Sequence, residues 1–190
     1  MKKVPVFKIL IAAIIHIALF VVGSVCGLIH PACYAFVGTI LPILFAFVYL
    51  YVCANMRCFG AALSLNGFAL IVGLIAGEGN LPLIIGLIGL ALIAELIRKL
   101  KGYETLKGVR WSFIPFAFSF YAYAFHWWTD TEASLAEALE EMPAGYADKM
   151  ASVIGDVRLL IVMLILVVPI AKLAMRLAEK VMKKQTAKLR

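Results

Sequence analysis

The chain of 190 residues is 64% hydrophobic, has a mean hydropathy of +1.00 and carries a formal net charge of +7 at pH 7. Soluble domains are about 45–50% apolar, so this composition excludes a soluble globular protein. The sequence is typical of an integral membrane protein, in which basic residues near segment ends reflect topology rather than nucleic-acid binding.

Six apolar segments are long enough, or nearly long enough, to cross a bilayer. A spanning helix needs about 20 apolar residues, because a rise of about 1.5 Å per residue must cover about 30 Å. The sequence predicts these helices at 7–28, 34–54, 61–76, 81–97, 111–128 and 153–173. Pro42 and Pro169 lie inside two of them, and membrane helices tolerate such prolines. We therefore expect an all-α fold of six transmembrane helices in which residues 1–190 form one domain.

The longest predicted connection is the loop at 129–152, between the fifth and sixth segments. Ser134 and Glu137 have the spacing of a capping box, which predicts that a short helix begins near Ser134. Pro143 and Gly145 are expected to end this helix. Apolar residues recur within it at helical spacing: Leu135, Ala138, Leu139 and Met142. The pattern predicts a short amphipathic helix on the outer surface of the membrane or the protein.

Basic residues divide unequally between the two ends of the predicted helices. The first end holds sixteen of the eighteen Lys and Arg residues: Lys2, Lys3, Lys8, Arg57, Arg98, Lys99, Lys101, Lys107, Arg110, Lys172, Arg176, Lys180, Lys183, Lys184, Lys188 and Arg190. The other end holds Lys149 and Arg158. It also holds eight acidic residues: Glu78, Asp130, Glu132, Glu137, Glu140, Glu141, Asp148 and Asp156. The positive-inside rule then predicts a multi-pass protein of a bacterial cell membrane with both termini in the cytoplasm.

No metal, cofactor or catalytic chemistry is predicted. The four cysteines, Cys26, Cys33, Cys53 and Cys58, lack zinc-ligand spacing, and we expect reduced thiols, although Cys26 and Cys33 flank one turn and could pair. The sequence has no P-loop motif. Its one arrangement of nucleophile and base would be Ser119 and His126, which two helical turns would separate by about 10 Å. We therefore expect a protein that is not an enzyme.

A ligand cavity is predicted at the acidic end, where aromatic and polar residues converge near the predicted outer helix. Cavities that bind small molecules combine aromatic walls with a few orienting polar groups. The candidate substrate-binding residues are Glu78, Asn80, His126, Trp127, Asp156 and Arg158. The alternative interpretation of Trp127 and Trp128 is the aromatic belt that membrane proteins place at the bilayer surface.

Three polar residues fall inside or at the ends of the predicted helices. A neutral His16 is expected to bond a neighbouring helix, and Asn66 is expected to join two helices. Glu95 lies one turn before Arg98 and Lys99, so a salt bridge at the helix end is predicted.

Two stretches of the sequence resemble a known family. The stretch at 86–102, "GLIGLALIAELIRKLKG", followed by Tyr103, is similar to a signature of the Trep-Strep family, also called MptD-type, and so is the stretch at 140–150, "EEMPAGYADKM". The resemblance spans nearly the whole chain. Members of this family are small bacterial membrane proteins regarded as substrate-binding S components of energy-coupling factor (ECF) transporters.

The resemblance implies six helices around an outward-facing pocket for a small-molecule substrate. It also implies two kinds of partner, namely a transmembrane coupling subunit and two ATP-binding-cassette (ABC) ATPases, which would power uptake. The chain departs from the family pattern at its end, "MKKQTAKLR", and in its first helix, where Ala12 is followed four residues on by His16 instead of Ala. The alternative function is an accessory or assembly membrane protein without a ligand.

Overall fold

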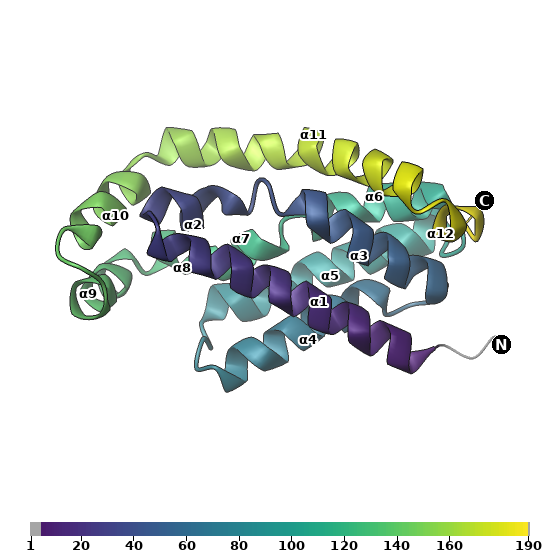
Figure 1. Ribbon diagram of the computed structural model, residues 1–190, viewed down its shortest axis with the longest axis horizontal. Coiled ribbons are helices and arrows are strands. Elements are labelled where there is room, and N and C mark those ends of the chain that lie inside the picture. Colours follow the sequence, from purple (N-terminus) through teal and green to yellow (C-terminus); the bar gives the residue numbers. More distant parts are fainter. Residues whose placement is uncertain (1–4, 190) are drawn as a thin grey trace.

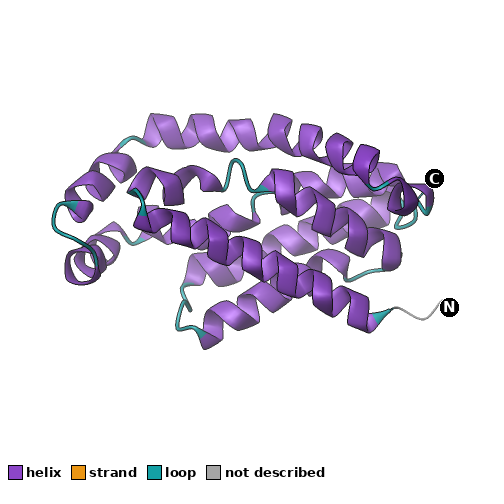
Figure 2. Cartoon of the chain, viewed as in Figure 1, coloured by secondary structure: helices purple, strands orange, loops and turns teal. Residues whose placement is uncertain are grey.

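The computed structural model describes residues 5–189, and every secondary-structure element in that range is helical (Figure 2). The first half of the chain forms α1 (Val6–Val25), the 3-10 helix η1 (Cys26–Leu28), α2 (Pro31–Val37), α3 (Pro42–Asn55), α4 (Ala61–Ile75) and α5 (Leu81–Lys101). The second half forms α6 (Leu106–Phe116), α7 (Ser119–Ala124), α8 (His126–Thr129), α9 (Thr131–Glu141), α10 (Tyr146–Gly155), α11 (Val157–Val181) and α12 (Lys183–Ala187).

The long helices run roughly along the longest dimension of the molecule (Figure 1). Helix α5 packs against α4, α6 and α7, helix α1 packs against α3 and α4, and helix α11 packs against α3 and α6. Helix α1 begins at the end of the molecule where α12 lies, whereas α9 and α10 lie at the opposite end (Figure 1). We call these the α12 end and the α9 end.

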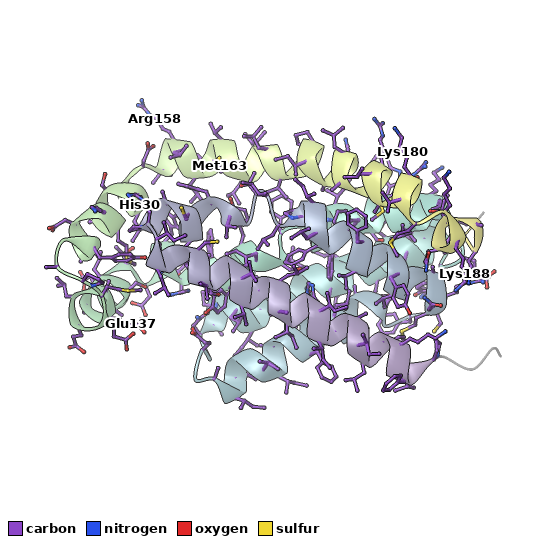
Figure 3. The ribbon with its side chains drawn as sticks, viewed as in Figure 1. His30, Glu137, Arg158, Met163, Lys180 and Lys188 are labelled. Carbon is purple, nitrogen blue, oxygen red and sulfur yellow. The ribbon has the colours of Figure 1, made fainter. Side chains whose placement is uncertain are left out.

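Charge separates along this long dimension. Lys180 and Lys188 lie at the α12 end, and Glu137 lies at the α9 end (Figure 3). Between the ends, the outward faces of the long helices carry exposed apolar side chains, such as Ile14 of α1, Ile85 of α5 and Ile165 of α11. Exposed apolar surface on this scale needs a cover. In an integral membrane protein, lipid provides it.

Four helical segments are long and apolar enough to cross a membrane: Val6–Leu28, Pro31–Asn55, Leu81–Lys101 and Val157–Val181. The second of these contains a break between α2 and α3, just before Pro42. Helix α4 is apolar but has only 15 residues. These segments support a multi-pass membrane protein. The count of six spanning helices stays a prediction.

The predicted fifth segment, 111–128, is divided among α6, α7 and α8 rather than forming one helix. Pro115 lies near the first break, and a proline removes one backbone donor and crowds the preceding turn. After it, the N–H of Phe118 donates to the carbonyl of Pro115, three residues back, at 3.1 Å, which forms a tight turn. Apolar composition alone carries no trace of such a break.

Two predicted helices differ from the observed ones in their ends. Helix α5 continues past residue 97 to Lys101, and α11 covers Val157–Val181 instead of 153–173. Residues 153–155 belong to α10, because Asp156 separates the two helices and caps α11. The charged last turns of α11 stay helical because Ala171, Ala174 and Ala178 keep one face buried against the bundle.

The predicted helix in the 129–152 loop is present as α9, but it begins at Thr131, three residues before the expected cap. Ser134 is buried, and its N–H donates to the carbonyl of Asp130 at 3.0 Å within the helix. The capping-box interpretation of Ser134 and Glu137 was therefore wrong. A second helix, α10, follows and extends to Gly155.

Candidate ligand cavity and its surroundings

A cavity of about 180 Å³ lies at the α9 end, between the bundle and the α9–α10 pair. Its walls contain four aromatic rings, those of Tyr34, Tyr123, Trp127 and Tyr146, beside the imidazole of His126. Three carboxylates also line it, from Glu78, Glu137 and Glu141. The lining includes no Lys or Arg among the described residues. The cavity therefore combines aromatic surface with negative charge.

The aromatic wall is built by α2 and α8. The ring of Tyr34 lies 4.4 Å from that of Trp127, centroid to centroid, at an interplanar angle of 34°. Helix α2 is fixed at its start by His30, whose Nδ1 accepts the N–H of Ala32 at 3.1 Å, and by Pro31 in the first turn. This start places Tyr34 one turn into the helix, against Trp127. Both rings are buried.

Two of the residues that line the cavity, Tyr123 and Glu78, are joined by a hydrogen bond. The phenol of Tyr123 donates to Oε1 of Glu78 at 3.0 Å. Glu78 lies in the turn between α4 and α5, next to Gly77, whose φ of 88° is in the left-handed region that glycine tolerates. A second cavity of about 200 Å³, with a mostly apolar lining from α1, α4 and α5, shares Ser24, Glu78 and Tyr123 with the first.

The α9–α10 pair covers the first cavity and is tied to the bundle by Tyr146. Its phenol donates to the carbonyl of Gly27 at 2.9 Å. Burial raises the pKa of Tyr146, so the hydroxyl stays protonated at neutral pH and remains a donor. Gly145, with φ of 81°, makes the turn before α10. The motif at 140–150 therefore supplies both the turn and the anchor of this cover.

The structure brings three of the six predicted substrate-binding residues together. Glu78, His126 and Trp127 line the cavity. Asn80 instead caps α5, accepting the N–H of Leu83 at 2.9 Å, and lines a neighbouring open hollow with His126. Asp156 caps α11 through the N–H of Leu159 at 3.0 Å. Arg158 is exposed and points away from the bundle (Figure 3).

Sequence reasoning missed Tyr34, Tyr146 and the carboxylates of α9 as cavity residues. Tyr34 stood at the start of a predicted spanning segment, where an aromatic side chain is ordinary. Tyr146 lay inside the recognised motif at 140–150, and that motif was the one signal that could have pointed to it. The position of Glu137 depends on how α9 folds back over the bundle, which no local pattern specifies.

A buried ion pair at the α12 end holds the end of α3 and the start of α4. Glu95 and Arg98 of α5 are both fully buried, with Nη1 and Oε1 at 3.2 Å. Glu95 also accepts the N–H of Ala62 at 2.7 Å, which caps the start of α4. Arg98 donates to the carbonyl of Met56 at 2.9 Å, beyond the end of α3. The predicted salt bridge at the end of this helix is therefore confirmed for Arg98.

Polar residues in the middle of the bundle behave in two ways. Asn66 joins helices as predicted, donating to the carbonyl of Leu87 at 3.1 Å and to Oγ of Ser119 at 3.0 Å. His16 differs from the prediction, because neither ring nitrogen has a hydrogen-bond partner in the structure. Its ring instead packs among Phe20, Phe45 and Phe116, with centroid distances of 4.7–5.3 Å.

All four cysteines are free thiols. Among residues 5–189, no group of three or more His, Cys, Asp or Glu side chains is placed to hold a metal ion.

The helical bundle, its exposed apolar faces and its spanning segments define an integral membrane protein. The family described as "Hypothetical bacterial integral membrane protein (Trep_Strep)" matches residues 5–188. The chain belongs to this family. Searches of curated proteins and of solved structures found no match.

Proposed function

We propose that this protein is the substrate-binding S component of an ECF-type importer. The observation that carries the proposal is the covered cavity at the α9 end, with its aromatic walls and its few polar groups. A coupling subunit and two ABC ATPases would supply the energy, since the sequence contains no nucleotide-binding loop of its own. The chain itself would capture the substrate and perform no catalysis.

The distribution of charge supports one orientation in the membrane. The α12 end carries the basic residues and would face the cytoplasm, with both termini. The α9 end would then face outward, so the cavity would take its substrate from outside the cell. Helix α9 would open and close over it, pivoting at the turn formed by Gly145, while Tyr146 keeps α10 on the bundle.

The substrate would be a small organic molecule with a positive charge. Carboxylates from Glu78, Glu137 and Glu141 surround a cavity whose described lining has no cationic side chain. Aromatic faces attract cations, by about 0.5–2 kcal/mol depending on desolvation. An anionic substrate would meet repulsion from three carboxylates and no compensating partner. The lining therefore favours an amine or another organic cation.

Mass spectrometry of small molecules that co-purify with the full chain in mild detergent tests the proposal. We expect a cationic metabolite to co-purify with the wild-type protein and with Trp111→Leu, because Trp111 is half exposed and remote from the cavity. Trp127→Leu should lose at least tenfold of it, since the variant removes one aromatic wall. Equal retention by both variants would place the metabolite elsewhere.

The transport role has its own test. The tagged protein, purified from its native membranes, should bring with it ATPase activity that depends on intact ABC subunits. Absence of both a co-purifying metabolite and such activity would favour the alternative, an accessory or assembly protein without a ligand. A metabolite without ATPase would support binding but not coupled import.

A further inference from the structure

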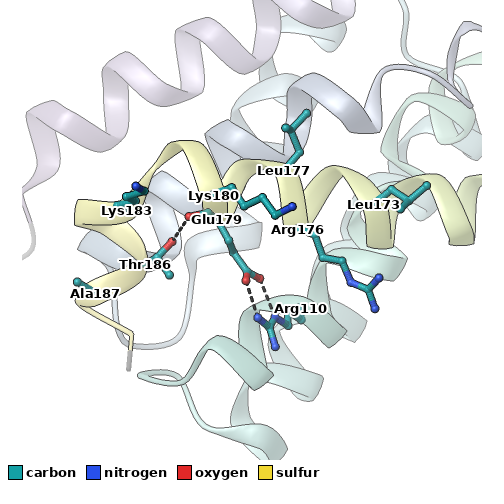
Figure 4. Close-up of a pocket in the computed structure, with 9 residues that line it drawn as sticks. All are labelled: Arg110, Leu173, Arg176, Leu177, Glu179, Lys180, Lys183, Thr186 and Ala187. Atoms are coloured by element: carbon teal, nitrogen blue, oxygen red, sulfur yellow. Dashed lines mark hydrogen bonds and ion pairs between the residues drawn. The ribbon is translucent and has the colours of Figure 1, made fainter.

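A second cleft, distinct from the cavity above, lies at the α12 end between α6, α11 and α12 (Figure 4). Its volume is about 840 Å³. Four cationic side chains line it: Arg110, Arg176, Lys180 and Lys183. They come from three helices, and Arg110 and Lys183 are 73 residues apart in the sequence. The fold brings them to one cleft. The ECF proposal makes no use of this cleft.

Among the described residues that line the cleft, the single carboxylate is already neutralised. Glu179 accepts two hydrogen bonds from the Arg110 guanidinium, one of them from Nε at 2.7 Å, in the bidentate geometry that such pairs favour. The backbone carbonyl of Glu179 also accepts the hydroxyl of Thr186 at 3.1 Å, which holds α12 against the cleft (Figure 4). Arg176, Lys180 and Lys183 therefore remain as positive charges for which the described part of the cleft offers no carboxylate partner.

One wall of the cleft is apolar and continues into the surface of the bundle. Leu173 and Leu177 of α11 line it and are exposed by 62% and 46%. Further along the same helix, Ile165 and Leu166 are exposed as well. A soluble anion would gain no binding energy from this apolar wall. An anion attached to acyl chains would contact the cations with its headgroup and the leucines with its chains.

We propose that this cleft binds the headgroup phosphate of an anionic phospholipid, taken from the membrane leaflet at the α12 end. Basic pockets between membrane helices at the cytoplasmic side bind anionic headgroups, and each nearby Lys or Arg adds attraction to an anionic surface. Arg176 can meet two phosphate oxygens with its planar guanidinium, while Lys180 and Lys183 add charge. The lipid would bridge α11 to α12 and steady the end of the bundle.

Native mass spectrometry in mild detergent tests the proposal with phosphatidylglycerol and phosphatidylcholine as probes. We expect the wild-type chain to bind one phosphatidylglycerol in clear preference to phosphatidylcholine. The triple variant Arg176→Gln, Lys180→Gln, Lys183→Gln should bind it at least tenfold more weakly. The matched control is Lys8→Gln, Lys99→Gln, Lys101→Gln, which removes the same charge from exposed positions outside the cleft and should bind as the wild type does.

Three outcomes would overturn the proposal. One is an equal loss in the cleft and control variants, which would indicate only a general basic end. Another is equal binding of the two lipids by the wild type. The third is displacement of phosphatidylglycerol by millimolar inorganic phosphate, which would indicate a site for a soluble anion. If the triple variant does not fold, Arg176→Gln alone gives the same comparison against Lys99→Gln.

Discussion

At the residue scale, Glu95 and Arg98 serve the backbone rather than a ligand. Together they satisfy the first turn of α4 and the carbonyls that follow α3. The ring of Tyr103 covers the guanidinium, 5.2 Å from its centre. Glu95 and Arg98, from the stretch at 86–102, and the following Tyr103 thus hold the connection between α3 and α4, and we call these three residues the clamp. These contacts explain in physical terms why these residue types occur together here.

Removing one member of the clamp should destabilise the protein strongly. Glu95→Gln leaves a buried arginine without its counter-charge, and breaking a buried pair costs about 3–5 kcal/mol. Glu179→Gln is the comparison variant: Glu179 is 10% exposed but its partner Arg110 is 53% exposed, so water can solvate the guanidinium once the pair is lost and the cost should be smaller. Thermal unfolding in detergent, followed by circular dichroism, should show a much larger decrease in Tm for Glu95→Gln. Equal decreases would contradict the clamp.

Some of these residues were predictable from the sequence, but their partners were not. The spacing of Glu95 and Arg98 on one helix predicted their salt bridge, because residues three apart share a helix face. The N–H of Ala62 and the carbonyl of Met56 were out of reach, since they lie more than 30 positions away and meet α5 only in the folded bundle. The same reason hid Tyr34 and Tyr146 from the predicted cavity.

At the element scale, helix α5 packs most closely against α7 at Gly86. A methyl group added there would lie 2.5 Å from Cβ of Ala122 and 3.2 Å from its Cα. Gly89, one turn further along, has open space around it. Small residues of this kind let membrane helices approach closely. The two glycines therefore lie in the same helix but have different surroundings.

Substituting each glycine by alanine should therefore change stability in opposite directions. Gly86→Ala forces two helices apart, and overpacking of this kind costs about 1–3 kcal/mol. Gly89→Ala meets no contact and removes a flexible residue from a helix interior, which stabilises by up to about 1 kcal/mol. The two Tm values, measured in the same detergent, should lie on either side of the wild-type value. A decrease of equal size for both would show that close packing at Gly86 is not what matters.

Composition indicated that long apolar runs such as those of α1 and α11 form helices, but it did not give the ends of α11, which covers Val157–Val181 instead of 153–173. It was poorer where a helix breaks. The bend after Pro115 depends on local backbone geometry, and α9 begins at Thr131 although the side chain of Asp130 before it makes no capping hydrogen bond. Helix α5 extends beyond the predicted boundary to Lys101, and its last buried residue is Arg98, which the pair with Glu95 fixes in the last turn.

At the scale of the whole molecule, the separation of charge between the two ends predicts which end faces the cytoplasm. Two native thiols report on it directly. Cys33 is exposed in the first turn of α2, and Cys58 is exposed in the connection between α3 and α4. The first lies toward the α9 end, and the second lies beside the clamp of Arg98, whose Nη1 donates to the Cys58 carbonyl at 3.3 Å.

Labelling of intact cells with a membrane-impermeant maleimide should modify a variant that retains only Cys33 and leave one that retains only Cys58 unlabelled. Both should react after the cells are opened, and a variant that retains only buried Cys53 should react in neither case until it is unfolded. Labelling of Cys58 in intact cells would reverse the topology and place the cavity on the cytoplasmic side.

The hydrogen bond between Tyr123 and Glu78 lies between two cavities of comparable size. One is lined by charged and aromatic side chains, and the other has a mostly apolar lining. Rotation of that one phenol would join them, and the space so created would suit an elongated guest with a cationic head and an apolar tail. Tyr123→Ala should keep the two cavities connected and shift the co-purifying metabolites toward longer chains. An unchanged chain-length profile would mean that the apolar cavity does not bind the tail.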